Sequence, residues 1–274
     1  MAAASAYSSI MVHLDLGAGA ENRVTLAAGI ADRFDAHLIG VAAAEPWPPV
    51  SGDPGMGMDP TIIDAHRQMV EEDIAAAEAL FRRAAGTAND VEWRTGEASP
   101  AAYLLQQSRA ADLVIVGRAS DADSRWHLHV APGDVVLGIG RPLLVAPPGA
   151  QRMKGDRVVV GWKDTTPSRR AIWDSLPFLK AAQEVFVVAV GDACDEGPQD
   201  VVAYLRRHAV RATLVLRPGT VVAPAEELLR TAEHEGADLL VVGAYGHARM
   251  REWILGGVTR DLLDDAPMCC LMSH

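Results

Sequence analysis

Short apolar runs alternate with longer segments of helical periodicity along the whole chain. The runs are rich in β-branched residues, as strands are. Between them, apolar positions recur every three or four residues, as in amphipathic helices. Strands are predicted near residues 8–15, 37–43, 90–95, 112–117, 142–146, 157–162, 184–190, 211–216, 238–243 and 267–272. Helices are predicted near residues 21–35, 61–86, 98–110, 132–139, 167–182, 198–208, 222–235 and 255–265.

This alternation predicts an α/β fold with a parallel, doubly wound sheet. Strands that are joined by crossover helices run in the same direction, and the crossovers are right-handed. Residues 113–116 and 239–242 are continuously apolar, which is typical of strands buried on both faces of a sheet.

The chain also contains an internal repeat, which indicates duplicated units. The segment ADLVIVG at residues 111–117 returns as ADLLVVG 126 positions later, whereas the first strands of the two halves are 148 positions apart. The first half therefore carries about 22 additional residues, for which the Pro- and Gly-rich stretch at 45–60 is the candidate. We predict two copies of one unit, with domains at residues 1–150 and 155–274.

Composition and charge narrow the range of partners. A net charge of −11 disfavours nucleic acid, and 5% aromatic residues are too few for a platform on which single-stranded bases stack. No apolar run approaches the roughly 18 residues that span a bilayer, and the N-terminus lacks the basic segment of an export signal. We therefore expect a cytoplasmic protein with no nucleic-acid or membrane partner.

The loop after the fourth strand of the second half has the features of a phosphate site. In such sheets ligands bind beyond the carboxyl ends of the strands. Gly243 and Gly246 permit close approach of the backbone or positive φ. Gly256 and Gly257 lead into a helix whose first amides are free to bind an anion, and Arg249 adds positive charge. The alternative interpretation is a loop whose glycines only turn the chain.

The spacing of these glycines resembles the nucleotide-binding signature of the universal stress protein family, G-2x-G-9x-G-[S/T]. Gly243, Gly246 and Gly256 stand at its three glycine positions. The resemblance extends over both halves, so the chain looks like a tandem member. It implies a five-stranded unit with strand order 3-2-1-4-5 in each half, and pairing of the two units as an intrachain pseudo-dimer. It also implies ATP, with Mg²⁺, as a ligand of the glycine loop.

The second half departs from the family pattern at two places. Gly257 stands where the signature has Ser or Thr, so a hydroxyl donor worth roughly 1.5–3 kcal/mol is lost, and Thr259 compensates in part. Where the family commonly places an Asp at the end of the first strand, this half has Lys163 and then Asp164. Either Lys163 meets phosphate, or Asp164 takes the role of the Asp, or both belong to a solvated strand end. The candidate binding residues are Lys163, Asp164, Gly243, Gly246, His247, Arg249, Gly256, Gly257, Val258 and Thr259.

The first half does not match the signature. Gly117 is present, but Ser120 and Val130 stand at the second and third glycine positions. Asp121 and Asp123 place negative charge where an anion would bind. We therefore predict that this half is a partner domain that binds no nucleotide, so that the chain binds one nucleotide in its second half.

Two further motifs carry weaker signals. Residues 17–22 match the dinucleotide-binding motif G-x-G-x-x-G at its first two glycines but lack the third. His127 and His129 can chelate a metal with the carboxylates at 121 or 123, although a lone H-x-H in a loop is more often solvated. We therefore expect neither a dinucleotide nor a metal.

Nothing in the sequence indicates a dedicated catalyst. Ser108, Ser168 and Ser175 lie in predicted helices without the G-x-S-x-G elbow, and no P-loop occurs. Cys269 and Cys270 point to opposite faces of one strand and are expected to be core thiols.

These observations favour a nucleotide-responsive stress protein that acts by binding. A slow enzyme of ATP hydrolysis or adenylyl transfer, with His247 as its candidate base, is one alternative. A structural stress scaffold that binds no nucleotide is another. Association of whole chains into homodimers is compatible with all three.

Overall fold

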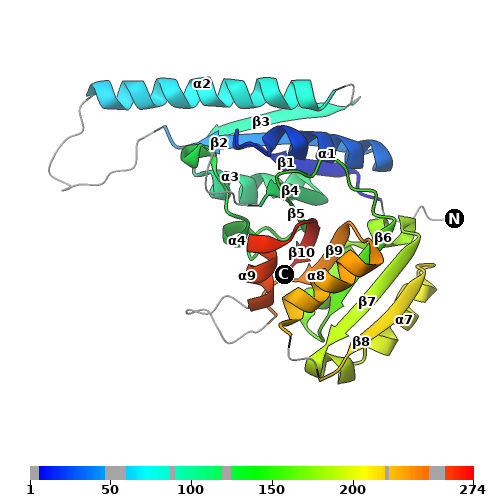
Figure 1. The fold of residues 1–274 in the computed structure, drawn as a ribbon. Helices are drawn as coiled ribbons and strands as arrows, with labels where there is room; N and C mark the ends of the chain where they lie inside the picture. The colour runs from blue at the N-terminus through cyan, green and yellow to red at the C-terminus, as the bar shows by residue number, and fades with distance from the viewer. Residues whose placement is uncertain (1–5, 47–59, 87–89, 119–124, 220–221, 247–256) are drawn as a thin grey trace.

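A computed structural model describes residues 6–46, 60–86, 90–118, 125–219, 222–246 and 257–274. Within these residues all strands belong to one ten-stranded sheet with the order β3-β2-β1-β4-β5-β10-β9-β6-β7-β8 (Figure 1). Each half thus has the order 3-2-1-4-5, as the resemblance implied. The α/β fold class with two tandem parallel units is confirmed.

The N-terminal half alternates strands and helices in the predicted sequence. Its strands are β1 (Ser9–His13), β2 (His37–Ala44), β3 (Val91–Glu97), β4 (Leu113–Gly117) and β5 (Leu143–Ala146). Its helices are α1 (Ala20–Phe34), α2 (Pro60–Ala84), α3 (Pro100–Gln107) and α4 (Pro132–Val135), with the 3₁₀ turns η1 (Ser108–Ala110) and η2 (Trp126–Leu128).

The C-terminal half repeats this arrangement. Its strands are β6 (Arg157–Trp162), β7 (Glu184–Val190), β8 (Ala212–Arg217), β9 (Leu239–Gly243) and β10 (Cys269–Ser273). Its helices are α5 (Thr166–Asp174), α6 (Leu176–Ala181), α7 (Pro198–Arg207), α8 (Pro224–Glu235) and α9 (Gly257–Asp265), with the 3₁₀ turn η3 (Gly191–Asp195).

The two halves meet along their fifth strands. β5 and β10 pair antiparallel, with Leu144 opposite Leu271, whereas the other strand pairs of the sheet are parallel. The pairing covers two edges that would otherwise expose backbone donors and acceptors. The two units thus pair within one chain, as the resemblance implied.

Two apolar layers, one on each face of the sheet, make up the core. One layer combines strand residues with α1, α2, α5, α6 and α7, and the other with α3, α4, α8 and α9. Both layers run through both halves. Cys269 lies in the first layer and Cys270 in the second, so the two thiols are buried on opposite faces as expected.

Two predicted helices differ from the observed ones. The helix expected over 167–182 is divided into α5 and α6, because Pro177 has no amide hydrogen and its ring clashes with the turn before it. The helix expected over 132–139 ends at Val135, and single hydrogen-bonded turns follow. Gly133 and Gly138 lower the helix propensity of that segment.

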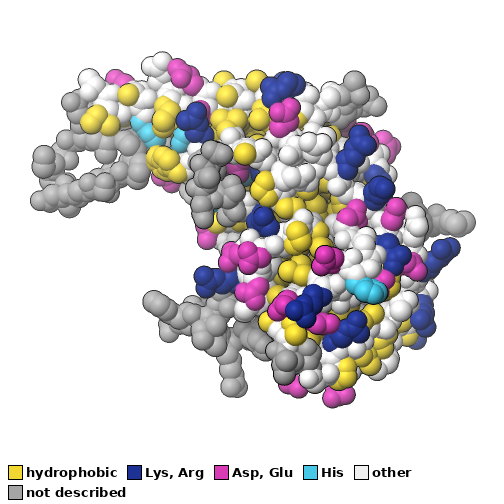
Figure 2. All heavy atoms as spheres, in the orientation of Figure 1, with side chains coloured by type: hydrophobic (Ala, Val, Ile, Leu, Met, Phe, Trp, Pro, Cys, Tyr) yellow, Lys and Arg dark blue, Asp and Glu magenta, His cyan; other side chains and the backbone are white. Residues whose placement is uncertain are grey.

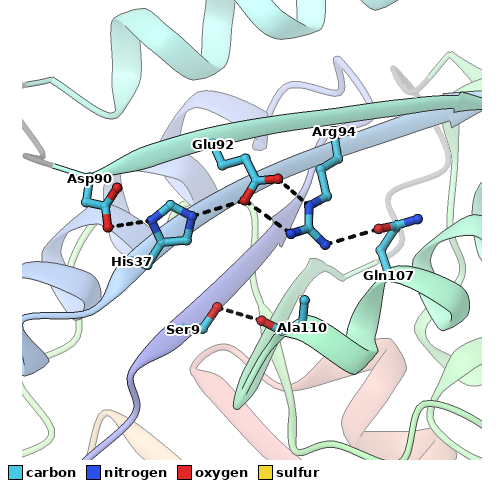
Figure 3. Close-up of polar contacts among 7 residues, drawn as sticks. All are labelled: Ser9, His37, Asp90, Glu92, Arg94, Gln107 and Ala110. Carbon is cyan, nitrogen blue, oxygen red and sulfur yellow. Dashed lines mark hydrogen bonds and ion pairs between the residues drawn. The ribbon is translucent and has the colours of Figure 1, made fainter.

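The free edge of the N-terminal half is covered by charged side chains. On β3, Glu92 lies 2.7 Å from Arg94 and 3.2 Å from His37 of β2, and His37 also lies 2.8 Å from Asp90 (Figure 3). Arg94 donates to Gln107 at the end of α3 at 3.1 Å. Charged side chains on an edge strand oppose pairing with another chain.

The surface in Figure 2 mixes acidic and basic side chains and gathers neither into one large patch. Among the helices that the structure describes, none is both long enough and apolar enough to cross a bilayer.

Candidate functional site

The candidate site lies where β6 and β9 run side by side. α5 follows β6 and covers one face of the sheet, whereas α9, which comes next in the chain after β9, covers the other. Helices that leave neighbouring strands on opposite faces open a crevice beyond the carboxyl ends of the strands. Gly243 ends β9 at the position where such sheets commonly bind their ligands.

Close packing of β9 against α5 requires a glycine at position 243. A Cβ at this position would lie 2.6 Å from the carbonyl carbon of Pro167 and closer still to the amide nitrogen of Ser168. Both atoms belong to the first turn of α5. The glycine at the end of β9 therefore lets the backbone of α5 approach the strand, which is the first of the two roles predicted for it.

Gly246 is also a close-approach glycine. A Cβ there would lie 2.9–3.1 Å from the side-chain atoms of Thr165. Thr165 is the N-cap of α5, and its hydroxyl accepts a hydrogen bond from the amide of Ser168 at 3.4 Å. The loop after β9 thus packs directly on the cap of the helix that follows β6.

The predicted positive φ falls on a different residue. Tyr245 adopts φ 53°, whereas neither Gly243 nor Gly246 has a positive φ. The sequence carried no signal for this, because an aromatic residue rarely adopts the left-handed region.

Gly257 is the first residue of α9 and is exposed. Among the described residues, which exclude 247–256, no heavy atom lies within 4 Å of the position of a Cβ on Gly257. No acidic side chain lies in the first turn of α9, so the helix dipole favours an anion there. Val258 is half-buried against the core layer. Thr259 is buried, and its Oγ1 accepts a hydrogen bond from the amide of Tyr245 at 3.2 Å. Because the Thr259 hydroxyl accepts this hydrogen bond, its own proton is not used in it.

Lys163 and Asp164 follow β6 and are exposed. Asp164 Oδ1 accepts a hydrogen bond from Arg169 Nε at 2.9 Å, and the amide of Asp164 donates to Glu196 Oε2 at 2.8 Å. The carboxylate is therefore paired with α5.

Three of the candidate binding residues, His247, Arg249 and Gly256, lie outside the described residues. The structure brings together Gly243, Gly246 and the N-terminus of α5. It also joins Tyr245 to Thr259 of α9 by a hydrogen bond.

The corresponding place in the N-terminal half is filled by an arginine that the sequence analysis missed. Arg23 of α1 is buried, its Nη2 lies 2.7 Å from Asp15 Oδ1, and its Nε donates to the carbonyl of His13 at 2.8 Å. A Cβ on Gly117 would lie 3.1 Å from Arg23 Cζ. The Arg23 guanidinium lowers the pKa of the Asp15 carboxyl against the opposing effect of burial.

A cavity of about 20 Å³ remains beside this ion pair, lined by Asp15, Gly17, Arg23, Arg118 and His129 among others. That volume holds roughly one water molecule. Residues 119–124, which include Ser120, Asp121 and Asp123, lie outside the described part of the chain, and Val130 is buried.

The two weaker motifs have structural roles in the N-terminal half. Gly19 packs against Pro148, because a Cβ there would lie 2.8 Å from Pro148 Cα, and Asn22 donates to the carbonyl of Pro148 at 2.9 Å. His127 Nε2 lies 2.9 Å from Asp73 Oδ2 of α2. Among the described residues no group of three His, Cys, Asp or Glu side chains is arranged to hold a metal.

Comparison with known proteins agrees with this architecture. The model of the universal stress protein family matches residues 6–147 and 172–274. The universal stress protein Slr1230 of Synechocystis is 28% identical over 159 residues, which are 56% of this chain and 54% of that protein. The chain thus spans about half the length of this curated relative.

Two solved structures share the fold over nearly the whole chain. A universal stress protein from Archaeoglobus fulgidus has a TM-score of 0.69 at 14% identity, covering 96% of this chain and 97% of that one. A protein of unknown function from Pseudomonas aeruginosa has a TM-score of 0.53 at 14% identity, covering 97% and 92%. With the family model matching most of the sequence in both halves, the chain belongs to the universal stress protein family.

Proposed function

We propose that this tandem universal stress protein binds ATP in its C-terminal half and acts as a regulatory binding protein. The observation that carries the proposal is the packing at the carboxyl ends of β6 and β9, where Gly243 and Gly246 bring the backbone after β9 onto the N-terminus of α5. The acid-free N-terminus of α9 comes next in the chain. Backbone amides at a helix N-terminus are suited to phosphate.

Lys163, the first residue after β6, supplies positive charge for an anionic ligand. The carboxylate of Asp164 is paired with Arg169, and the carboxylate of Glu196 accepts a hydrogen bond from the Asp164 amide. A lysine and the amides at the start of α9 suit the phosphates of a nucleotide, and Mg²⁺ would accompany it as the counter-ion of ATP. The chain's own contribution is to bind and orient the phosphates with amides and a lysine.

The N-terminal half is proposed not to bind nucleotide. Asp15, which stands at the strand end where the family commonly places its ribose-facing Asp, accepts hydrogen bonds from Arg23 and from the amide of Gly17. Its carboxylate is therefore paired within the protein, and the cavity that the described residues leave beside it holds about one water molecule.

Restoring the missing hydroxyl tests the proposal without removing any contact. Gly257 has no positive φ, and no heavy atom of the described residues lies within 4 Å of its Cβ position, so Gly257→Ser adds a hydroxyl donor without a clash against that part of the chain. Gly257→Ala is the matched control, since it adds the Cβ alone. We expect calorimetric titration to show ATP bound about tenfold more tightly by Gly257→Ser than by Gly257→Ala. Equal affinities in the two variants would contradict the site.

Catalysis is tested separately. A regulatory binding protein should release labelled product from ATP no faster than buffer in a single-turnover assay. Release well above that background would favour the slow enzyme.

A further inference from the structure

Both neighbours of Lys163 are bound by one residue from another part of the chain, Glu196. The indole Nε1 of Trp162, the last residue of β6, donates to the carbonyl of Glu196 at 3.1 Å. The amide of Asp164 donates to Glu196 Oε2 at 2.8 Å. Lys163 therefore lies between two hydrogen bonds to the same residue.

Glu196 itself is fixed by the elements around it. It follows η3, which contacts β7 and α7, and its amide donates to the carbonyl of Ala193 at 3.2 Å. Gly197 comes next with φ 69° and caps α7. β7 pairs in parallel with β6, so Glu196 reaches the turn after β6 from beyond the end of the neighbouring strand.

The N-terminal half fixes the corresponding turn without an outside residue. Asp15 stands 148 positions before Lys163, and its Oδ1 accepts a hydrogen bond from the amide of Gly17 at 3.0 Å. A lysine ammonium has no acceptor, so Lys163 cannot bind an amide of its own turn in this way. In the C-terminal half the carboxylate of Glu196 accepts from the turn instead.

We propose that Glu196 is a positioning residue of the C-terminal site, which holds the turn after β6 so that Lys163 meets the phosphates of the ligand. This inference rests on the proposed function. A turn that is fixed before binding loses less conformational freedom when the ligand arrives, so the two hydrogen bonds raise affinity.

A purely electrostatic role of Glu196 predicts the opposite effect. Its carboxylate repels the phosphates of a ligand bound beside Lys163, so removal of the charge alone would strengthen binding. Loss of the hydrogen-bond acceptor weakens binding if Glu196 positions the turn. The direction of the change therefore distinguishes the two roles.

Two substitutions separate the acceptor from the charge. Glu196→Ala removes both, whereas Glu196→Gln removes the charge and keeps a side-chain oxygen that can accept from the Asp164 amide. We expect calorimetric titration to show ATP bound about threefold more weakly by Glu196→Ala than by Glu196→Gln, and Glu196→Gln to bind at least as tightly as the wild type. Equal or tighter binding in Glu196→Ala than in Glu196→Gln would overturn the proposal.

Double variants show whether Glu196 acts through Lys163. In the background of Lys163→Gln, the Ala and Gln substitutions at position 196 should give equal affinities for ATP, because the side chain that they position is gone. A difference that persists in that background would overturn the proposed route through Lys163.

Hydrogen exchange separates this inference from the proposed function. The amide of Asp164, observed by NMR in the absence of nucleotide, should exchange faster in Glu196→Ala than in Glu196→Gln. Equal exchange would overturn the hold on the turn even where ATP binds. Absence of ATP binding in the wild type would instead overturn the proposed function, and with it the role of Glu196 toward the ligand.

Discussion

Asp15 and Arg23 form a buried ion pair in the N-terminal half, with Arg23 Nη2 2.7 Å from Asp15 Oδ1. In the C-terminal half the residue 148 positions after Arg23 is Ala171, which is also buried. One half thus places a guanidinium beside the ends of β1 and β4, whereas the aligned residue of the other half is an alanine packed in the core. This difference underlies the asymmetry that we propose for nucleotide binding.

Arg23→Lys should destabilise the protein by about 1–3 kcal/mol. A lysine cannot both pair with Asp15 and donate to the carbonyl of His13 as the guanidinium does, so a buried polar group loses its partner. Urea denaturation measures the free energy of unfolding.

Arg82→Lys is the matched control for that change. Arg82 pairs with Glu78 on the exposed side of α2, where an ion pair contributes little. Its substitution should stay within about 0.5 kcal/mol of the wild type. An Arg23 variant as stable as the Arg82 variant would contradict the structural role of the guanidinium.

Buried His13 makes stability fall in mild acid. Burial, together with the charges of Arg23 and His129, lowers the pKa of His13 from 6.5 to about 4, and the carboxylate of Asp15 opposes part of that shift. Between those two values the unfolded chain binds a proton that the folded chain does not. The free energy of unfolding should therefore drop by up to roughly 3 kcal/mol as the pH falls from 6.5 to 4.

His13→Asn should remove that part of the pH dependence, as measured by urea denaturation at a series of pH values. His234→Gln is the control, because His234 is exposed on α8 and its loss should leave the slope intact. The same slope in His13→Asn and the wild type would show that another group is responsible.

Below pH 4 the free energy of unfolding should fall further as Asp15, whose pKa is lowered in the folded protein, becomes protonated.

The order of strands and helices could be predicted from the sequence because periodicity and apolar runs are local properties. The repeat of residues 111–117 at 237–243 then gave the division into two units. The break between α5 and α6 also had a local signal, Pro177, which the expected helix over 167–182 ignored.

The site was predicted less fully, because its decisive contacts join residues that are distant in the sequence. Gly243 and Gly246 could be identified from spacing, but their packing on Pro167 and Thr165 depends on how α5 meets β9. A buried Arg23 runs against the usual exposure of arginine. The contact between Glu196 and the turn after β6 depends on the pairing of β6 with β7.

Lys163→Gln should weaken ATP binding by roughly two- to fivefold, since an exposed lysine acts on phosphate as a screened point charge. The difference should shrink as salt rises. Asp164→Asn should have a smaller effect, because that carboxylate is paired with Arg169. Calorimetric titration at two ionic strengths compares the variants, and a larger loss in Asp164→Asn would assign the ligand-facing role to Asp164 instead.

Separated halves should not remain monomeric. Expressed alone, residues 1–150 expose the edge of β5 and residues 155–274 expose the edge of β10, including Leu144 and Leu271, which face each other in the whole chain. Unpaired apolar edges recruit other strands. Light scattering after gel filtration should find dimers or larger species for each half, and two stable monomers would argue against the role of this pairing.

The number of nucleotides bound per chain tests the account most directly. Native mass spectrometry of the whole chain titrated with Mg·ATP should show one bound nucleotide at saturation. That occupancy should increase at low ATP in Gly257→Ser without a second nucleotide appearing. Two nucleotides per chain would contradict the filled site around Arg23, and none would contradict the C-terminal site.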